Sequence, residues 1–159
     1  MAGAKLIGEK EFNQWTGFVA VDGTPIKAAN NGTTKRSSLV SSEPDAGWYV
    51  REGNHDGSNE SDPSKTMWAY EATLAVMTFS KTEDEMPSLL LGMSLDKPGH
   101  NIGKRAQDAL THIISDDELP KGYFIGDRAY LPNSKPENLA MPLRLAGYKM
   151  MGDQRGDSL

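Results

Sequence analysis

The sequence predicts a mixed α/β fold built on one open sheet, and three observations support this class. Short apolar runs of strand character recur along the chain. One segment beyond residue 101 has apolar residues at helical spacing. Helical segments occur only in the second half, between strands, where helical crossovers place strands parallel. The predicted order is β-β-β-α-β-α-β, with a long polar insertion after the first strand.

The first half of the chain is predicted to contain strands separated by polar loops. A strand at 17–22 has Phe, Val and Ala character, and the sequence Gly23-Thr24-Pro25 is expected to turn it into a return strand near residue 26. Residues 30–46 and 53–65 are polar and predict loops on either side of a short strand at 48–51. We therefore place the polar insertion at about 30–66.

The segment 67–79 is long and mostly apolar, and it allows either a helix or a strand. A strand is favoured because aromatic and β-branched residues are frequent and no capping signal is present. Another strand is predicted at 88–95, after the charged connection 81–87. In the segment 67–79, the residues that alternate at period two are Trp68, Tyr70, Ala72, Leu74 and Val76.

The second half predicts two helices and two more strands. A helix from about 102 to 115 is expected to be capped by Asn101. A strand at 123–127 and an interrupted helix at 136–146 follow, because Pro142 would break that helix before it closes at Gly147. A last strand begins near 148. The first helix should bury one stripe, consisting of Ile102, Ala106, Ala109, Leu110 and Ile113.

The composition indicates one soluble domain. The chain has 159 residues, of which 37% are hydrophobic and 25% charged. It has no apolar run near the ~20 residues that span a bilayer and no signal-peptide pattern, so we expect a cytoplasmic protein without a membrane partner. With no cysteine, any metal must be held by oxygen or imidazole. The net charge of −5 argues against a surface devoted to nucleic acid but leaves a nuclease-type core open.

Two aspartates stand at the end of strand-like runs. Asp22 follows the run at 18–21, and Asp127 follows the run at 123–126, each beside a glycine. A carboxylate at the end of a buried strand is rigidly held yet reaches the surface, as a divalent-metal site requires. The alternative is a pair of turn-forming aspartates, and spacing alone leaves both interpretations open.

Other candidate residues have simpler structural explanations. Glu71 is expected to be a solvent-facing partner in a strand, and Asp96 to form a turn. Arg128 could contact phosphate, orient Asp127 or lie at the surface. His55 and Asp56 lack a partner pair at metal-ligand spacing. The aromatic residues Trp48, Trp68 and Tyr70 are expected to pack in the core or the insertion and not to stack on bases.

Five segments in order resemble the catalytic core of insertion-sequence DDE transposases, which belong to the ribonuclease-H-like superfamily. The resemblance covers roughly residues 15–155, and the order of the motifs carries it more than any single one. The segments are FVAVDGTPIK (18–27), GWYVREG (47–53), WAYEAT (68–73), GDRAY (126–130) and PLRLAGY (142–148).

The resemblance implies metal-dependent DNA cleavage and strand transfer by two aspartates and a glutamate. Asp22 and Asp127 match the two aspartates, and Mg²⁺ or Mn²⁺ would be the cofactor. The expected partners are transposon ends and target DNA, and self-association is also open. Because no phosphate-cradling glycine pattern is present, no nucleotide cofactor is expected.

The third acid of the family has no counterpart in this chain. No glutamate follows Glu137, and Asp153 and Asp157 come too early to match it. We therefore expect residues 1–159 to be one partial catalytic domain whose final helix is missing. Such a fragment should bind metal weakly and be inactive alone.

Two other functions are alternatives to the transposase function. A ribonuclease-H-like nuclease or resolvase would cut DNA with metal but would not join ends, so a strand-transfer assay separates it. A non-catalytic folded remnant would bind no manganese and would tolerate Asp22→Asn without any change.

Overall fold

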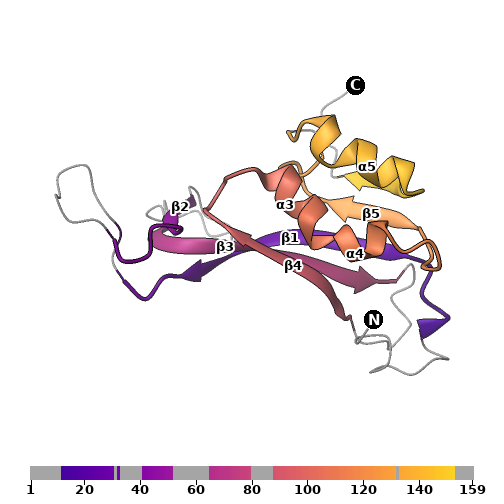
Figure 1. Cartoon of the computed structure of the whole chain (residues 1–159), viewed down its shortest axis with the longest axis horizontal. Helices are drawn as coiled ribbons and strands as arrows, with labels where there is room; N and C mark the ends of the chain where they lie inside the picture. The colour runs from indigo at the N-terminus through magenta and orange to yellow at the C-terminus, as the bar shows by residue number, and fades with distance from the viewer. Residues whose placement is uncertain are drawn as a thin grey trace, which may run out of the picture. The chain divides into compact units, whose positions relative to one another are not determined.

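The computed structural model describes residues 12–30, 32, 41–51, 65–79, 88–131 and 133–152. Six strands in these residues form one mixed sheet of order β2-β3-β1-β5-β6, with β4 paired to β3 off this path. The predicted mixed α/β class is confirmed (Figure 1). The strands are β1 (Phe18–Lys27), β2 (Gly47–Arg51), β3 (Lys65–Thr78), β4 (Leu90–Asp96), β5 (Tyr123–Gly126) and β6 (Lys149–Gly152). The helices are α3 (Ile102–Ala109), α4 (Thr111–Ile114), the 3₁₀ helix η1 (Pro136–Asn138) and α5 (Ala140–Leu145).

Backbone packing divides the chain into two compact units. The helix-bearing unit comprises Met1–Gly23, Thr73–Ser94 and Asn101–Leu159. The hairpin unit comprises Thr24–Ala72 and Leu95–His100. The predicted insertion at about 30–66 falls within the hairpin unit, and strands β1, β3 and β4 contribute residues to both units.

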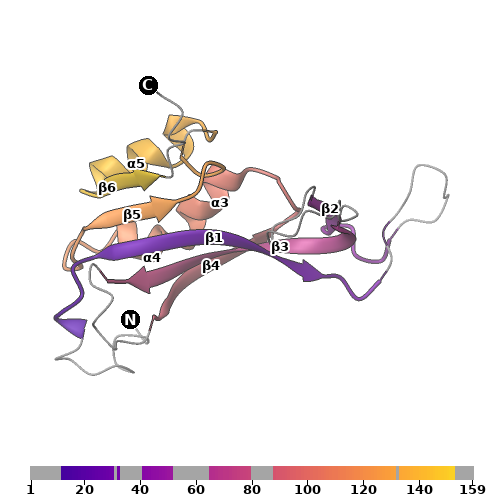
Figure 2. The ribbon, with the colours of Figure 1, turned by 180° about the vertical axis from the view of Figure 1, so that it is seen from behind.

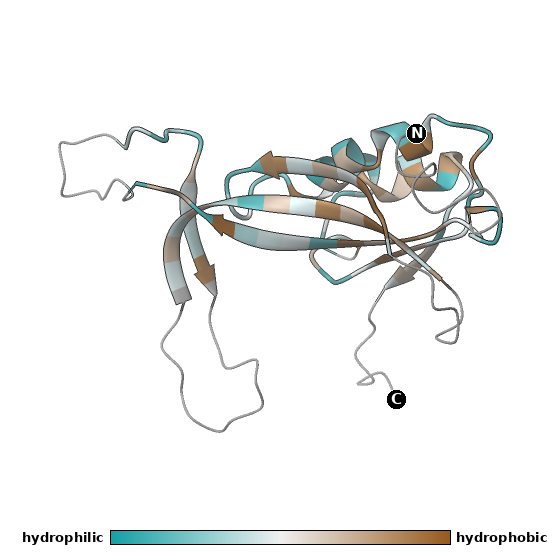
Figure 3. Cartoon of the chain, turned by 90° about the horizontal axis from the view of Figure 1, so that it is seen from below, coloured by the Kyte–Doolittle hydropathy of each residue, from teal (hydrophilic) through white to brown (hydrophobic). Residues whose placement is uncertain are grey.

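The core of the helix-bearing unit lies between one face of its strands and its helices. Val19 of β1 and Phe124 of β5 are fully buried, as are Leu110 and Ile113 from the helical side. The predicted apolar stripe of the first helix is thus confirmed, with Ile102 packed at its edge. Figures 1 and 2 show α3, α4 and α5 on one side of strands β5 and β6. Figure 3 shows hydrophobic segments along the strands and hydrophilic ones on the helices.

The first strand departs from the prediction. The expected turn at Gly23-Thr24-Pro25 does not form, because β1 continues unbroken to Lys27. Alternate residues of β1 stay partly covered up to Pro25, so the period-two pattern of a strand extends past the proline. Asp22 therefore lies inside a strand, although the pairing of β1 with β5 ends just before it.

The helix ends also differ from the predictions. Asn101 makes no side-chain capping hydrogen bond and adopts a left-handed conformation with φ of 47°. The helix predicted at 102–115 divides at Leu110 into α3 and α4. The helix at 136–146 is interrupted as predicted, but at Leu139 (φ −149°) and not at Pro142, which occupies the third position of α5. Proline is tolerated in a first helical turn, because amide groups there have no partner within the helix.

The hairpin unit is built on the antiparallel pair β2 and β3. Their register places Gly47 opposite Ala69 and Trp48 opposite Trp68. The strand predicted at 67–79 is confirmed and begins at Lys65. The backbone amide of Ala28 donates to the carbonyl oxygen of Trp68 at 2.9 Å, which joins the end of β1 to this pair.

Candidate functional site

Asp22 and Asp127 follow the last matched residues of two neighbouring parallel strands. The register of β1 and β5 ends with Val21 opposite Gly126, and an aspartate follows each of them in the chain. Adjacent strands lie about 4.8 Å apart, so the residues just before the two aspartates are direct neighbours in the sheet. Both side chains are exposed. The predicted neighbourhood of the two strands is confirmed, and the binding of a cation stays a prediction.

Each aspartate makes one local hydrogen bond with its Oδ1 atom. Asp22 Oδ1 accepts from the amide of Gly23 at 2.8 Å, and Asp127 Oδ1 accepts from the amide of Ala129 at 2.8 Å. The carbonyl oxygen of Asp127 also accepts from Tyr130 at 3.2 Å, so this residue forms the turn after β5. Among the described residues neither Oδ2 atom has a hydrogen-bond or ion-pair partner. The turn-forming role therefore holds for Asp127, whereas Asp22 lies within β1, and in each carboxylate the local hydrogen bond uses only Oδ1.

The alignment of β1 with β5 is fixed by a close approach of two glycines at their beginning. The amide of Gly122 donates to the carbonyl oxygen of Gly17 at 3.1 Å. A Cβ atom at Gly17 would lie 2.2 Å from the carbonyl oxygen of Pro120, and Gly17 has φ of +80°. At Gly122 it would lie 2.5 Å from that of Thr16. Only glycine allows these backbones so close, and the register that aligns the aspartates starts from this contact.

Lys121 anchors β5 to the end of α4. Its Nζ donates to the carbonyl oxygens of Ile113 and Asp116, the latter at 2.7 Å. These carbonyls lie at and just beyond a helix C-terminus, where a cation is favoured. Burial lowers the pKa of Lys121, while the nearby Asp116 and Asp117 carboxylates act in the opposite direction. The strand that leads to Asp127 thus begins at a fixed point.

The face of β1 that carries Asp22 differs from the face that carries the core. On β1, Val19 and Val21 are buried, whereas Phe18 and Ala20 are only half-buried. On this second face Phe18 packs edge-to-face on Tyr123 of β5, with ring centroids 5.1 Å apart. The Nζ of Lys149 lies 5.7 Å from the Tyr123 ring centroid. In Figure 2 none of the described helices covers this side of β1, β5 and β6.

The other predicted candidates take part in ordinary local contacts. Glu71, in the hairpin unit, accepts a hydrogen bond from the amide of Gly99 at 2.7 Å. Asp96 accepts from the amide of Lys97 at 2.7 Å, as its turn sequence predicted, and its Oδ2 lies 3.0 Å from His100 Nδ1. Arg128 is half-buried, and no ion pair joins it to Asp127 among the described residues.

Several predictions concern residues outside the described part of the chain. These include the His55-Asp56 pair and the two late acids Asp153 and Asp157. Within the described residues no cluster of three or more His, Asp or Glu side chains could hold a metal ion. The candidate site therefore consists of two carboxylates.

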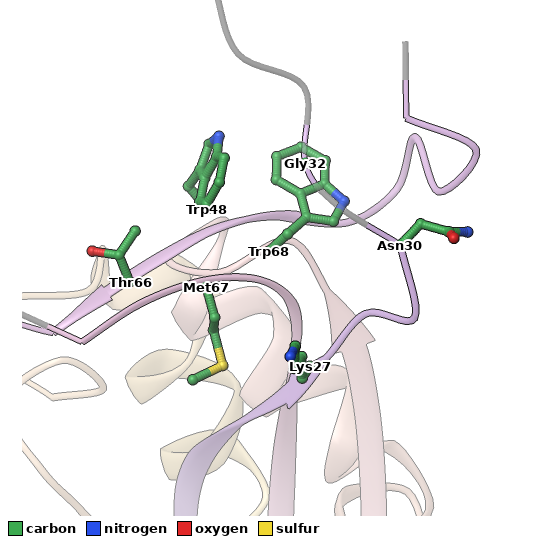
Figure 4. Close-up of a pocket in the computed structure, with 7 residues that line it drawn as sticks. All are labelled: Lys27, Asn30, Gly32, Trp48, Thr66, Met67 and Trp68. Atoms are coloured by element: carbon green, nitrogen blue, oxygen red, sulfur yellow. The ribbon is translucent and has the colours of Figure 1, made fainter. Parts of the chain in front are cut away.

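Trp48 and Trp68 pack edge-to-face against each other in the hairpin unit, in keeping with the predicted packing in the core or the insertion. Trp48 is nevertheless 45% exposed, and both residues line a pocket (Figure 4). The signal that could have found this pair is the opposite placement of the two residues in β2 and β3. That placement depends on the register and cannot be read from either strand alone.

Comparison of the chain with protein-family models, curated proteins and solved structures gave no match. Among the described helices, none has the length and apolar character needed to cross a bilayer. The functional interpretation therefore rests on the site geometry and on the motifs in the sequence.

Proposed function

We propose that this chain provides the two-aspartate part of a metal-dependent DNA phosphoryl-transfer site of the DDE transposase type. One observation carries the proposal: Asp22 and Asp127, 105 residues apart in the sequence, follow opposed residues of adjacent parallel strands. Turn formation accounts for Asp127 alone. It gives no reason for the two aspartates to follow opposed residues of neighbouring strands.

Within the mixed α/β class, we infer that the sheet has the ribonuclease-H-like arrangement. Support comes from the position of β1 between β3 and β5, and from the parallel pairing of β5 with both β1 and β6. The antiparallel pair β2 and β3 lies on the other side of β1. The ordered motifs at 18–27, 126–130 and 142–148 occupy β1, the end of β5 with the turn after it, and the end of α5 with the residues that lead to β6.

The donor set suits a hard divalent cation. Both Oδ2 atoms are carboxylate oxygens without a partner among the described residues, and both side chains reach solvent, which supplies water ligands. Mg²⁺ needs only one or two carboxylates and keeps several waters. When bound, such an ion would neutralise the developing charge on a DNA phosphate and activate the attacking oxygen. Because the described residues bring two acids to the site and not three, we expect weak affinity and no turnover by this chain alone.

Paramagnetic line broadening tests this site, because it detects weak manganese binding residue by residue. In a ¹⁵N-labelled sample, Mn²⁺ at low concentration should first broaden the amide signals of Gly23, Arg128 and Ala129. Excess Mg²⁺ should restore them. Asp22→Asn and Asp127→Asn should each abolish the effect, and Asn keeps the Oδ1 atom that accepts the local hydrogen bond. Asp45→Asn, which changes an exposed aspartate of the hairpin unit, should leave the broadening unchanged.

A DNA ligand provides the second half of the test. Because a phosphate shared with the cation couples the two binding events, a short DNA duplex should lower the Mn²⁺ concentration needed for broadening. The same duplex should have no such effect on Asp127→Asn. Broadening centred on other acidic residues, or unchanged by either substitution, would contradict the proposal. Nicked products without joined ends, if any activity appears, would favour the nuclease alternative.

A further inference from the structure

Asp22 holds its side-chain carboxyl group against the backbone amide of the next residue. The amide nitrogen of Gly23 lies 2.8 Å from Asp22 Oδ1. The carboxyl carbon that bears this oxygen is therefore also close to the nitrogen. These two atoms form the new bond when an aspartyl residue closes to a cyclic succinimide. Holding reacting atoms near each other lowers the entropic part of the barrier to such a ring closure.

The surroundings of Asp22 leave room for this ring. Gly23 has no side chain to shield the amide nitrogen, and glycine has the most freely rotating backbone of any residue. The Asp22 side chain is exposed, so water can leave and enter. The pairing of β1 with β5 ends at Val21, so β5 does not hold the backbone of these two residues in place. Contact, access and backbone freedom therefore coincide at one peptide bond.

Other aspartates of the described residues lack one of these features. Asp96 Oδ1 accepts from the amide of Lys97 at 2.7 Å, but the lysine side chain shields that amide and restricts its backbone. Asp127 Oδ1 accepts from the amide of Ala129, two residues further on, so this hydrogen bond does not involve the next amide. Within the described part of the chain, Asp22 is the one aspartate followed by glycine. The combination of contact and glycine thus distinguishes Asp22.

We propose that Asp22 is a site of spontaneous isoaspartate formation. The nitrogen of Gly23 bonds to the side-chain carboxyl carbon of Asp22, and the carboxyl hydroxyl leaves with the amide hydrogen as one water. Water then adds to either carbonyl carbon of the succinimide. Opening at one carbonyl restores aspartate, and opening at the other leaves the backbone running through the former side chain. The water released in the first step is taken up in the second, and no oxidant or reductant takes part.

The product alters both β1 and the candidate site. Isoaspartate adds one methylene to the backbone and leaves the free carboxylate directly on the α-carbon. An extra backbone atom interrupts the pleat that sets the alternation of side chains along a strand. The carboxylate is then displaced from its place beside the end of β5, so the modified chain should not show Mn²⁺ broadening at Gly23. This loss of metal binding rests on the proposed function, whereas the formation of isoaspartate does not.

Peptide mapping tests the site, because isoaspartate and aspartate have equal mass but give different backbone fragments. Trypsin releases residues 11–27 as one peptide, in which Asp22 is the only aspartate. In the whole chain, incubated at neutral pH in EDTA, isoaspartate should form at Asp22 at least about tenfold faster than at Asp96, a difference of ~1.4 kcal/mol in activation free energy. Unfolding the chain in urea removes the contact with Gly23 and should not raise the rate at Asp22. Equal rates at the two aspartates, or formation only in urea, would overturn the proposal.

Gly23→Ala is the matched variant. Gly23 does not have a positive φ, so alanine fits its backbone, while the added methyl group hinders attack by the nitrogen. Isoaspartate at Asp22 should then form at least about fivefold more slowly, or ~1 kcal/mol in activation free energy. Thr24→Ala, at the exposed next residue, should leave the rate unchanged. An unchanged rate in Gly23→Ala would contradict the proposal.

Two further measurements separate this inference from the proposed metal site. Asp22→Asn closes the same ring with loss of ammonia and should react faster than the original chain, so metal-binding samples of this variant are used fresh. Saturating Mn²⁺ should slow the reaction of the original chain, because the ion would hold the Asp22 carboxylate. Isoaspartate that forms in EDTA and at the same rate in Mn²⁺ would support this proposal and count against the metal site.

Discussion

Val21 on β1 lies opposite Gly126 on β5 in a parallel pair, and an aspartate follows each of them in the chain. The buried Val21 faces the core, so Asp22 points to the other side of the sheet, and Asp127 is exposed where β5 ends. Like charges on neighbouring strands repel, and this repulsion is the cost of placing two carboxylates at one level. A bound cation would replace this repulsion by an attraction of both carboxylates to the ion. The relationship therefore makes the stability of the chain sensitive to these two residues.

Asp22→Asn should stabilise the metal-free chain by about 0.5 kcal/mol, because it removes one of two neighbouring negative charges. The substitution retains the oxygen that accepts from Gly23. Urea unfolding in EDTA measures the gain, and saturating Mn²⁺ should abolish or reverse it by stabilising the original chain alone. Asp45→Asn should change nothing in either condition, and a loss of stability in Asp22→Asn without metal would count against the paired arrangement.

Tyr148 should make the chain lose stability at alkaline pH. Burial raises the pKa of Tyr148 from 10.0 to about 12, so the folded state holds the phenol proton more tightly than the unfolded state. This contribution is fully present below pH 10 and is lost as the pH rises through 12, by roughly 2–3 kcal/mol. Comparing the free energy of unfolding at pH 8 and pH 11.5 measures it. Tyr148→Phe should show a smaller fall, and equal falls would contradict the assignment.

Thr73→Val should raise the free energy of unfolding by about 1 kcal/mol. Thr73 is fully buried in β3, and its hydroxyl has no hydrogen-bond partner among the described residues. Valine has a similar shape without the polar atom, so the desolvation cost disappears. Thermal unfolding measures the change. The control Thr111→Val, at an exposed hydroxyl that donates to Gln107 at 3.2 Å, should stay within about 0.5 kcal/mol.

Gly92→Ala should destabilise the helix-bearing unit by about 2–4 kcal/mol. A Cβ atom at Gly92 would lie 1.9 Å from the carbonyl oxygen of Ala109, so β4 and the end of α3 would have to separate. Gly99→Ala provides the comparison, because its Cβ would meet nothing within 4 Å and only its φ of +69° opposes alanine. That variant should lose only about 1 kcal/mol. Similar urea midpoints for the two variants would contradict the close packing at Gly92.

The sequence alone determined the local elements and the identity of the two acids. Helical spacing identified the buried face that includes Leu110 and Ile113, and apolar runs located the strand that contains Asp22 and the strand that leads to Asp127. These signals work because side-chain periodicity reflects which face of an element is buried. They misplaced the end of β1, since Pro25 suggests a turn unless neighbouring strands hold the chain extended.

Only the tertiary structure decided which elements meet. The register of β1 with β5 sets the two aspartates at one level, and the register of β2 with β3 sets Trp48 opposite Trp68. Pairing between distant strands depends on glycine contacts such as Gly17 with Gly122 and on burial of whole faces. Such contacts and such burial exist only in the folded chain. A local pattern carries the chemistry of a residue but not the identity of its neighbour.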